Sequence, residues 1–270
     1  MNWMTKVAAA LVGALAMPAL GQNTSPWERA SIAVGGMIAD LDSSAQIGLG
    51  GTGLEIDVED VLDLDSSQSS FRVDALYRFG SSRRHRIDFT WFDLDRDGTK
   101  TLSRDIDVDG VTYPVGTTVQ SAFDLAFYNV RYSYSFVFDD RIDLAGSIGL
   151  HVTEVGLSVS SAAQGRRGED VTAPLPVIGV RLDVLLAPKW YVRTSWEALY
   201  LAYDGAEGAI SDAMVAVEYR PWQRFALGAG LNAVRFRLEG EEGSDFPELD
   251  VNAKFDLNYT GLLLYGKLMF

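Results

Sequence analysis

The sequence predicts an all-β protein, a transmembrane antiparallel up-and-down β-barrel of ten strands, with any count from eight to twelve left open. Apolar and polar residues alternate with a period of two along segments that are longer than most globular strands. Short turns alternate along the chain with long polar loops, which is typical of membrane barrels. A secreted β-sandwich also alternates, but its strands are usually shorter and its outer face is polar.

The alternation is clearest in 122-AFDLAFYNVRYSYSFVF-138 and 71-FRVDALYRF-79, where one face is apolar or aromatic and the other is polar. The ten expected strands are about Glu28 to Leu41, Ser69 to Phe79, Arg86 to Val108, Val111 to Phe138, Ile142 to Ser160, Ala173 to Ala187, Trp190 to Tyr203, Ala209 to Arg220, Phe225 to Leu238 and Asn252 to Phe270. Long loops are expected near 42–68, 93–118, 161–172 and 239–251, and short turns at the opposite end.

Aromatic residues gather beside the expected short turns. This set contains Tyr77, Phe79, Phe136, Phe138, Trp190, Tyr191, Tyr219, Trp222 and Phe225. A looser set, Tyr128, Tyr200, Tyr203 and Phe236, stands toward the other strand ends. Aromatic girdles at both interfaces are typical of barrels that span a membrane.

Residues 1–21 have the pattern of a cleaved secretory signal peptide, with Lys6 before a short apolar run and a small-residue site ending at Gly21. We therefore expect one barrel domain over 22–270. Loss of Lys6 takes the formal charge from -14 to -15, which disfavours nucleic acid as a partner. The chain has no cysteine, so disulfides and thiolate metal sites are excluded.

Three stretches, 71-FRVDALYRF-79, 84-RHRIDFTWFDLDRDGT-99 and 144-LAGSIGLHV-152, resemble small Gram-negative outer-membrane barrel proteins of unassigned function. The resemblance implies a single-chain barrel of the broad OmpA/OmpW-type class in the outer membrane, and it brings no catalytic residues. The chain end also resembles the signal that the barrel assembly machinery recognises, through Gly266, Leu268 and Phe270.

The polar face of the expected strands carries acidic and basic residues in similar numbers. Assigned to the interior, they are Arg72, Asp74, Arg78, Asp88, Arg131, Asp143, Arg181, Asp183, Arg193, Glu197, Glu218 and Arg220, and Lys267 can join them. An unpaired charge in a narrow, poorly hydrated interior costs several kcal/mol, so we expect a paired network. Such a network closes a pore more readily than it lines one, and about ten strands leave little open width.

The stretch 93-DLDRDGTKTLSRDIDVDG-110 has two D-x-D-x-D-G patterns, as at the start of an EF-hand calcium loop. The twelfth positions are Arg104 and Gly116, which cannot supply the bidentate carboxylate that the loop needs. We expect a solvated acidic hairpin that turns at Asp109-Gly110. Only weak calcium or magnesium binding at outer loops is expected, with the candidates Asp93, Asp95, Asp97, Asp105, Asp107 and Asp109, and no other cofactor.

Only His85 and His151 are available for histidine chemistry. His151 and Thr153 faintly resemble the His-x-Ser of lipid A deacylase barrels, but Thr153 is a poor nucleophile and the alternation places His151 inside. We therefore expect a monomeric outer-membrane protein without enzymatic activity, either structural and surface-interacting or a narrow solute path, in contact with membrane lipid and lipopolysaccharide. The alternative is a lipid-acting enzyme that uses His151.

Overall fold

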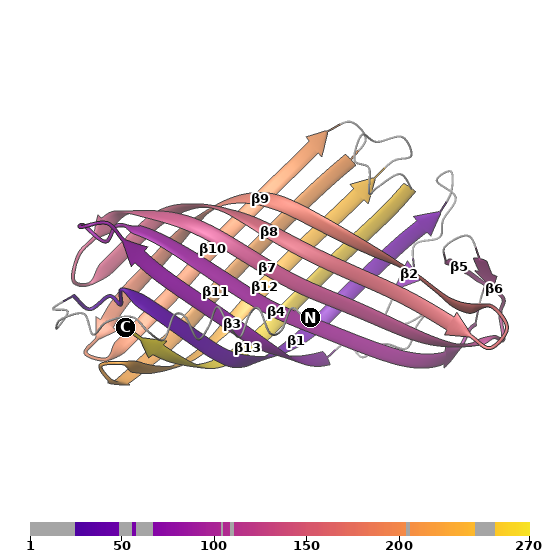
Figure 1. The fold of residues 1–270 in the computed structure, drawn as a ribbon, viewed down its shortest axis with the longest axis horizontal. Coiled ribbons are helices and arrows are strands. Elements are labelled where there is room, and N and C mark those ends of the chain that lie inside the picture. Colours follow the sequence, from indigo (N-terminus) through magenta and orange to yellow (C-terminus); the bar gives the residue numbers. More distant parts are fainter. Residues whose placement is uncertain are drawn as a thin grey trace, which may run out of the picture.

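A computed structural model describes residues 25–48, 56–57, 67–103, 105–108, 111–203, 206–240 and 252–270. Ten long strands form the wall: β1 (Ala30–Gly48), β3 (Ser67–Phe79), β4 (His85–Thr101), β7 (Thr118–Phe138), β8 (Ile142–Ser161), β9 (Gly165–Ala187), β10 (Trp190–Tyr203), β11 (Ala206–Trp222), β12 (Phe225–Gly240) and β13 (Asn252–Met269). Each pairs with its antiparallel neighbour, and β13 pairs with β1 (Figure 1). The sheet is therefore a closed barrel.

The predicted fold class and the count of ten wall strands are confirmed. Six of the ten expected ranges agree with the structure within three residues at both ends. The expected loop at 161–172 is wrong, because β8 and β9 continue into each other through a tight turn at residues 162–164. The strand expected to begin at Val111 begins instead at Thr118.

The region 93–118 is only partly a loop. Strand β4 continues through Asp93, Asp95 and Asp97 to Thr101, and the chain then forms a separate hairpin of β5 (Ile106–Val108) and β6 (Val111–Tyr113). The expected turn residues 109–110 lie outside the described residues, but Val108 pairs with Val111, which leaves two residues between the strands. A short strand, β2 (Ile56–Asp57), pairs with the far end of β1.

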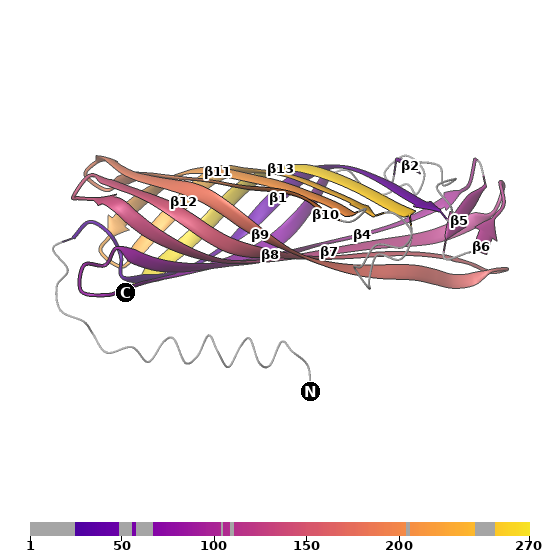
Figure 2. The ribbon, with the colours of Figure 1, turned by 90° about the horizontal axis from the view of Figure 1, so that it is seen from above.

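The β5–β6 hairpin lies at the end of the barrel that is opposite the short turns and the C-terminus (Figures 1 and 2). Leu102, Ile106 and Tyr113 are buried against the interior core. The Tyr113 hydroxyl donates to the carbonyl oxygens of Val159 and Gly165 at 3.1 and 3.3 Å, so the buried phenol is satisfied. The hairpin therefore forms a lid over this end of the barrel.

The outer surface carries a band of exposed apolar side chains. Among them are Val34, Ile38, Phe71, Ile87, Val130, Ile148, Ile178, Val180, Val215, Leu231, Leu262 and Leu264. Exposed Tyr77, Phe136, Trp190, Tyr219 and Trp222 form the aromatic level at the short turns. Tyr191 and Phe236 were wrongly placed in the girdles, because their side chains are buried inside the barrel at 7% and 3% exposure.

The interior changes character along its length. Toward the short turns it is charged, whereas toward the lid it is an apolar core that includes Met37, Leu41, Phe92, Leu94, Phe123, Leu125, Phe127, Leu175, Phe236 and Leu257. The rings of Phe92, Phe127 and Tyr259 pack together at 4.7 to 6.0 Å between centroids, near the boundary of the two halves. The expected charged interior therefore occupies the half of the barrel near the short turns, and the lid half is mainly apolar.

The signal-peptide residues 1–21 lie outside the described part of the chain, so that assignment stays a prediction. No helix in the described ranges has the length and apolar character needed to span a membrane.

Candidate functional site in the barrel interior

Inward positions on the wall strands, together with one residue that precedes them, bring sixteen charged side chains together near the short turns. We call this set the lumen network; its eight bases are Arg72, Arg78, Arg86, Arg131, Arg181, Arg193, Arg220 and Lys267, and its eight acids are Glu28, Asp74, Asp88, Asp143, Asp183, Glu197, Asp212 and Glu218. Most of these side chains are less than 12% exposed. The equal numbers make the network electrically balanced.

A continuous series of contacts crosses this network from the short-turn end to mid-depth. Its members, in order, are Glu28, Arg193, Asp183, Arg86, Asp88, Arg131, Glu197, His151 and Asp212. Arg193 donates to Glu28 at 2.8 Å and to Asp183 at 2.7 Å. Toward the far end, Arg131 lies 3.4 Å from Glu197. No wide aqueous path remains among side chains packed in this way.

Two further groups complete the network. Asp143 accepts from Arg78 and, at 3.0 Å, from Arg181, and both Arg78 and Asp143 are fully buried. Glu218 pairs with Lys267 and accepts from the Tyr265 hydroxyl at 3.0 Å. Since breaking a buried pair leaves an uncompensated charge, these contacts specify which strands lie opposite each other.

The chain before β1 closes the barrel at the short-turn end. Trp27 is 2% exposed, and its indole N–H donates to the carbonyl oxygen of Asp139 at 2.6 Å. Tyr191 packs edge-on against Trp27 and donates to the carbonyl oxygen of Pro26 at 3.3 Å. We call Pro26, Trp27 and Glu28 the N-terminal plug, because these residues fill the interior there.

Glu28 fixes the plug to three strands. Its carboxylate accepts from Arg193 on β10 at 2.8 Å, from Arg220 on β11 at 2.6 Å and from Lys267 on β13 at 3.3 Å. Burial alone would raise the pKa of Glu28, but the charges of Arg193, Lys267 and Arg220 hold it well below its usual value. Glu28 is therefore ionised, and its carboxylate is the anion that the three bases share at the short-turn end of the barrel.

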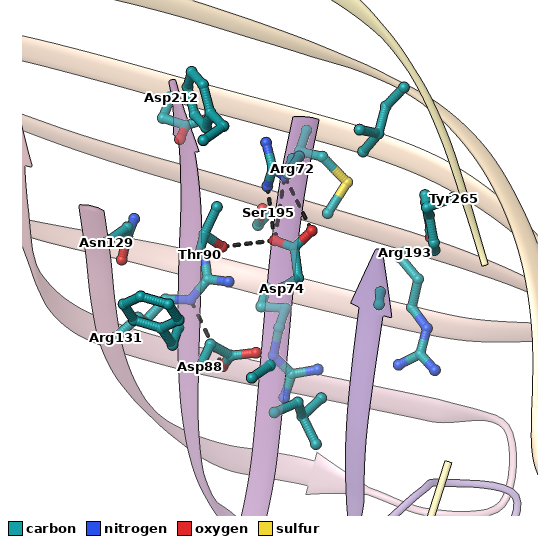
Figure 3. Close-up of a pocket in the computed structure, with 18 of the residues that line it drawn as sticks. Arg72, Asp74, Asp88, Thr90, Asn129, Arg131, Arg193, Ser195, Asp212 and Tyr265 are labelled. Atoms are coloured by element: carbon teal, nitrogen blue, oxygen red, sulfur yellow. Dashed lines mark hydrogen bonds and ion pairs between the residues drawn. The ribbon is translucent and has the colours of Figure 1, made fainter. Parts of the chain in front are cut away.

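A cavity of about 100 Å³ lies where the charged and apolar halves meet. Figure 3 shows the side chains around it, including Arg72, Asp74 and Asp212. Arg72 donates to Asp74 at 3.0 Å, and Thr90 donates to the same carboxylate at 2.7 Å. The cavity has room for a few small polar molecules.

The outer acidic residues do not form one site. Asp93, Asp95 and Asp97 lie on β4 among outward positions, whereas Asp105 accepts from the backbone N–H of Val115 at 2.7 Å. The side chain of Asp107 and all of Asp109 lie outside the described part. In the described ranges, the one group of three or more potential ligands close enough to share a metal ion is His151, Glu197 and Asp212.

The two histidines lie in different surroundings. His151 is 3% exposed and faces the interior, as the alternation predicts, and Thr153 beside it is fully buried. His85 lies near the short turns, where its ring stacks on Phe79 and its Nδ1 contacts the Tyr132 hydroxyl at 2.7 Å. The arrangement gives no support to a lipid-facing catalytic group at His151.

Several members of the network escaped the sequence analysis. Arg86 and Asp212 have the same strand parity as Asp88 and Glu218, so the alternation contained the signal that could have found them. Glu28 precedes β1 and has no periodic pattern around it. Its role depends on how the chain enters the barrel, which the sequence does not encode locally.

No family model and no curated protein matches this chain. Among solved structures, the outer membrane protease OmpT from Escherichia coli matches with a TM-score of 0.58 at 8% identity, covering 93% of this chain and 99% of that one. The fold is that of an outer-membrane β-barrel.

Two other matches have lower TM-scores. The transport unit of the autotransporter AIDA-I from Escherichia coli gives 0.43 at 8% identity, covering 98% of both chains. The attachment invasion locus protein Ail of Yersinia pestis gives 0.35 at 14% identity, covering 87% of this chain and 97% of that one. No activity of this chain follows from any of these similarities.

Replacing Glu28 by Gln should destabilise the barrel strongly. The change keeps the shape of the side chain but leaves Arg193, Arg220 and Lys267 without their shared carboxylate. We expect the free energy of unfolding at pH 7 to fall by roughly 3 to 5 kcal/mol, the usual cost of breaking a buried pair. Denaturant unfolding followed by tryptophan fluorescence measures it. The exposed Glu207→Gln is the control, with an expected change within about 0.5 kcal/mol.

The effect of Glu28→Gln should also depend on pH. A carboxyl group whose pKa is lowered on folding stabilises the folded state above its unfolded pKa, about 4.3, and loses that contribution as the pH falls through the folded value. The difference between wild type and Glu28→Gln should therefore shrink when the pH is lowered from about 6 to about 3. A difference that stays constant over this range would contradict the assignment.

Proposed function

We propose that the protein resides in the outer membrane as a barrel with a closed interior, and that its role is structural and surface-interacting. The observation that carries this proposal is the closure of the interior at three levels. The N-terminal plug fills the short-turn end, the lumen network fills the middle, and the apolar core with its β5–β6 lid fills the other end. The exposed apolar band and aromatic level support placement in a membrane.

The closed interior disfavours the narrow solute path. A path for a polar solute would have to cross the mostly apolar core around Phe123, Leu125 and Phe127, where the buried guanidinium of Arg96 is stacked on the Phe123 ring at 4.4 Å. It would then have to break the buried pairs of the network. An enzymatic role is disfavoured too, because His151 is enclosed and lies beside Thr153 rather than a serine.

The outward face near the lid is the remaining place for contact with a partner. Several acidic side chains project there beyond the apolar band, and we call them the acidic collar: Asp40, Asp42, Asp93, Asp95, Asp97, Asp124 and Glu154. Asp95 lies directly opposite Asp124 across the β4–β7 ladder. Like charges in this relation destabilise a sheet unless a cation lies near them. We infer that the collar contacts lipopolysaccharide phosphates through bridging calcium or magnesium.

Single-channel recording tests the closed interior. Refolded protein covering 22–270 should give no discrete conductance steps in planar bilayers, because packed side chains block every level of the interior. Compact migration in an unheated detergent gel would show that the silent protein is folded. Reproducible steps of one size from folded protein would overturn the proposal and favour the solute path.

Neutralising part of the acidic collar tests the surface contact. We expect Asp95→Asn combined with Asp124→Asn to weaken calcium-dependent binding of lipopolysaccharide by roughly fivefold for each charge, which corresponds to about 1 kcal/mol for an exposed pair. Asp139→Asn combined with Asp140→Asn makes the same charge change at the short-turn end and should leave binding unchanged. Equal loss in both variants would indicate a general charge effect and contradict a specific role for the collar.

A further inference from the structure

Three potential metal ligands from three different strands meet inside the barrel. His151 on β8, Glu197 on β10 and Asp212 on β11 point toward one another, and their ligand atoms lie within 4.8 Å of one another. His151 Nε2 is 3.2 Å from Glu197 Oε2 and 3.9 Å from Asp212 Oδ2. His151 and Glu197 are 3% and 2% exposed, and the side chain of Asp212 is 21% exposed toward the cavity.

The hydrogen bonds around the three ligands leave lone pairs of nitrogen and oxygen directed into the space between them. The amide nitrogen of Asn129 contacts both His151 Nε2 and, at 2.8 Å, Glu197 Oε2. If the amide donates to both, His151 Nε2 presents a lone pair, and a lone pair 3.2 Å from a carboxylate oxygen is unfavourable without a cation. The other ring nitrogen, Nδ1, is buried without a hydrogen-bond partner, and so is Glu197 Oε1. The nearest base, Arg131, approaches that second oxygen.

We propose that His151, Glu197 and Asp212 bind a divalent first-row transition metal ion such as Zn²⁺. A mixed imidazole and carboxylate set suits Zn²⁺, Co²⁺ or Ni²⁺, whereas Ca²⁺ and Mg²⁺ prefer sites made of oxygen alone. A half-turn of the Asn129 amide places its Oδ1 where its Nδ2 lies, which supplies a fourth ligand atom. The site does not depend on the proposed function of the outer surface.

The surroundings fit a metal site in two further respects. Asn232 donates to Asp212 Oδ1 at 2.7 Å, which orients the carboxylate and leaves Oδ2 directed at His151. A hydrogen bond that holds a ligand side chain in position is a usual feature of metal sites. Both His151 and Asp212 line the cavity of about 100 Å³, so the cluster has free space beside it. Because the barrel is closed at both ends, we expect the ion to enter during folding.

The test is to refold the protein covering 22–270 with Zn²⁺ or with a chelator, remove free metal and count the bound metal by elemental analysis. We expect one equivalent of Zn²⁺ in the wild type and a lower thermal midpoint for protein refolded in chelator. Refolding with Co²⁺ should give visible absorption bands of a bound ion. His85→Gln is the matched control, because the chain has two histidines and this one lies at the short turns. It should keep the metal.

His151→Gln should lose the bound equivalent and the Co²⁺ bands. Asn232→Ala leaves all three ligands in place and should lower the affinity by about tenfold or more. It provides a second readout if His151→Gln does not fold. The proposal is overturned if folded wild type retains no metal after refolding in excess Zn²⁺, or if folded His151→Gln binds as much as His85→Gln does.

Discussion

The pairing of inward charges is the constraint on which this structure depends. A barrel of ten strands is too narrow to hydrate charged side chains well, so each base at an inward position needs an acid within reach. The lumen network meets this need with eight bases and eight acids, and some of its contacts join strands that are distant in the ladder, such as β4 with β9 and β7 with β10. Glu28 extends the same principle to the chain before β1, because its carboxylate pairs with Arg193, Arg220 and Lys267 from three different strands.

The lid half of the barrel is built differently. There the interior positions hold mainly Phe, Leu, Val and Met, with the buried Arg96 stacked on Phe123, and the β5–β6 hairpin covers them. The outward positions at the same level carry the acidic collar, so polarity is reversed between the two surfaces of the wall. Strands that extend beyond the apolar band are expected to show this reversal, because their outer face is in water and their inner face is enclosed. The outer face is then the surface that a partner can reach.

Much of the fold could be predicted from the period-two pattern, because the side chains of a strand alternate between two environments. The pattern also placed Arg131, Arg181 and Glu197 inside, since a charged residue on an otherwise apolar band is costly. It failed at Phe236, which was expected in the outer girdle. The neighbouring Arg235 and Arg237 are exposed on the outer face, and the Phe236 ring is buried inside the barrel.

Other features depend on pairing between distant segments. The meeting of His151, Glu197 and Asp212 requires the register of β8, β10 and β11, which no local pattern gives. Likewise, Tyr191 looks like a girdle residue beside a short turn, but the N-terminal plug gives it a partner inside the barrel. The extension of β8 and β9 through 161–172 was missed because that stretch is polar, and a strand with water on its outer side has no apolar face to reveal it.

Closure of the interior to water can be tested directly by single-cysteine labelling, because the chain has no cysteine of its own. Ser133 faces the interior and is fully buried, whereas Glu207 is exposed. In the folded barrel, Ser133→Cys should resist a water-soluble thiol reagent that modifies Glu207→Cys readily, and both should react after unfolding. Rapid and equal labelling of the two folded variants would show a hydrated interior and contradict the account.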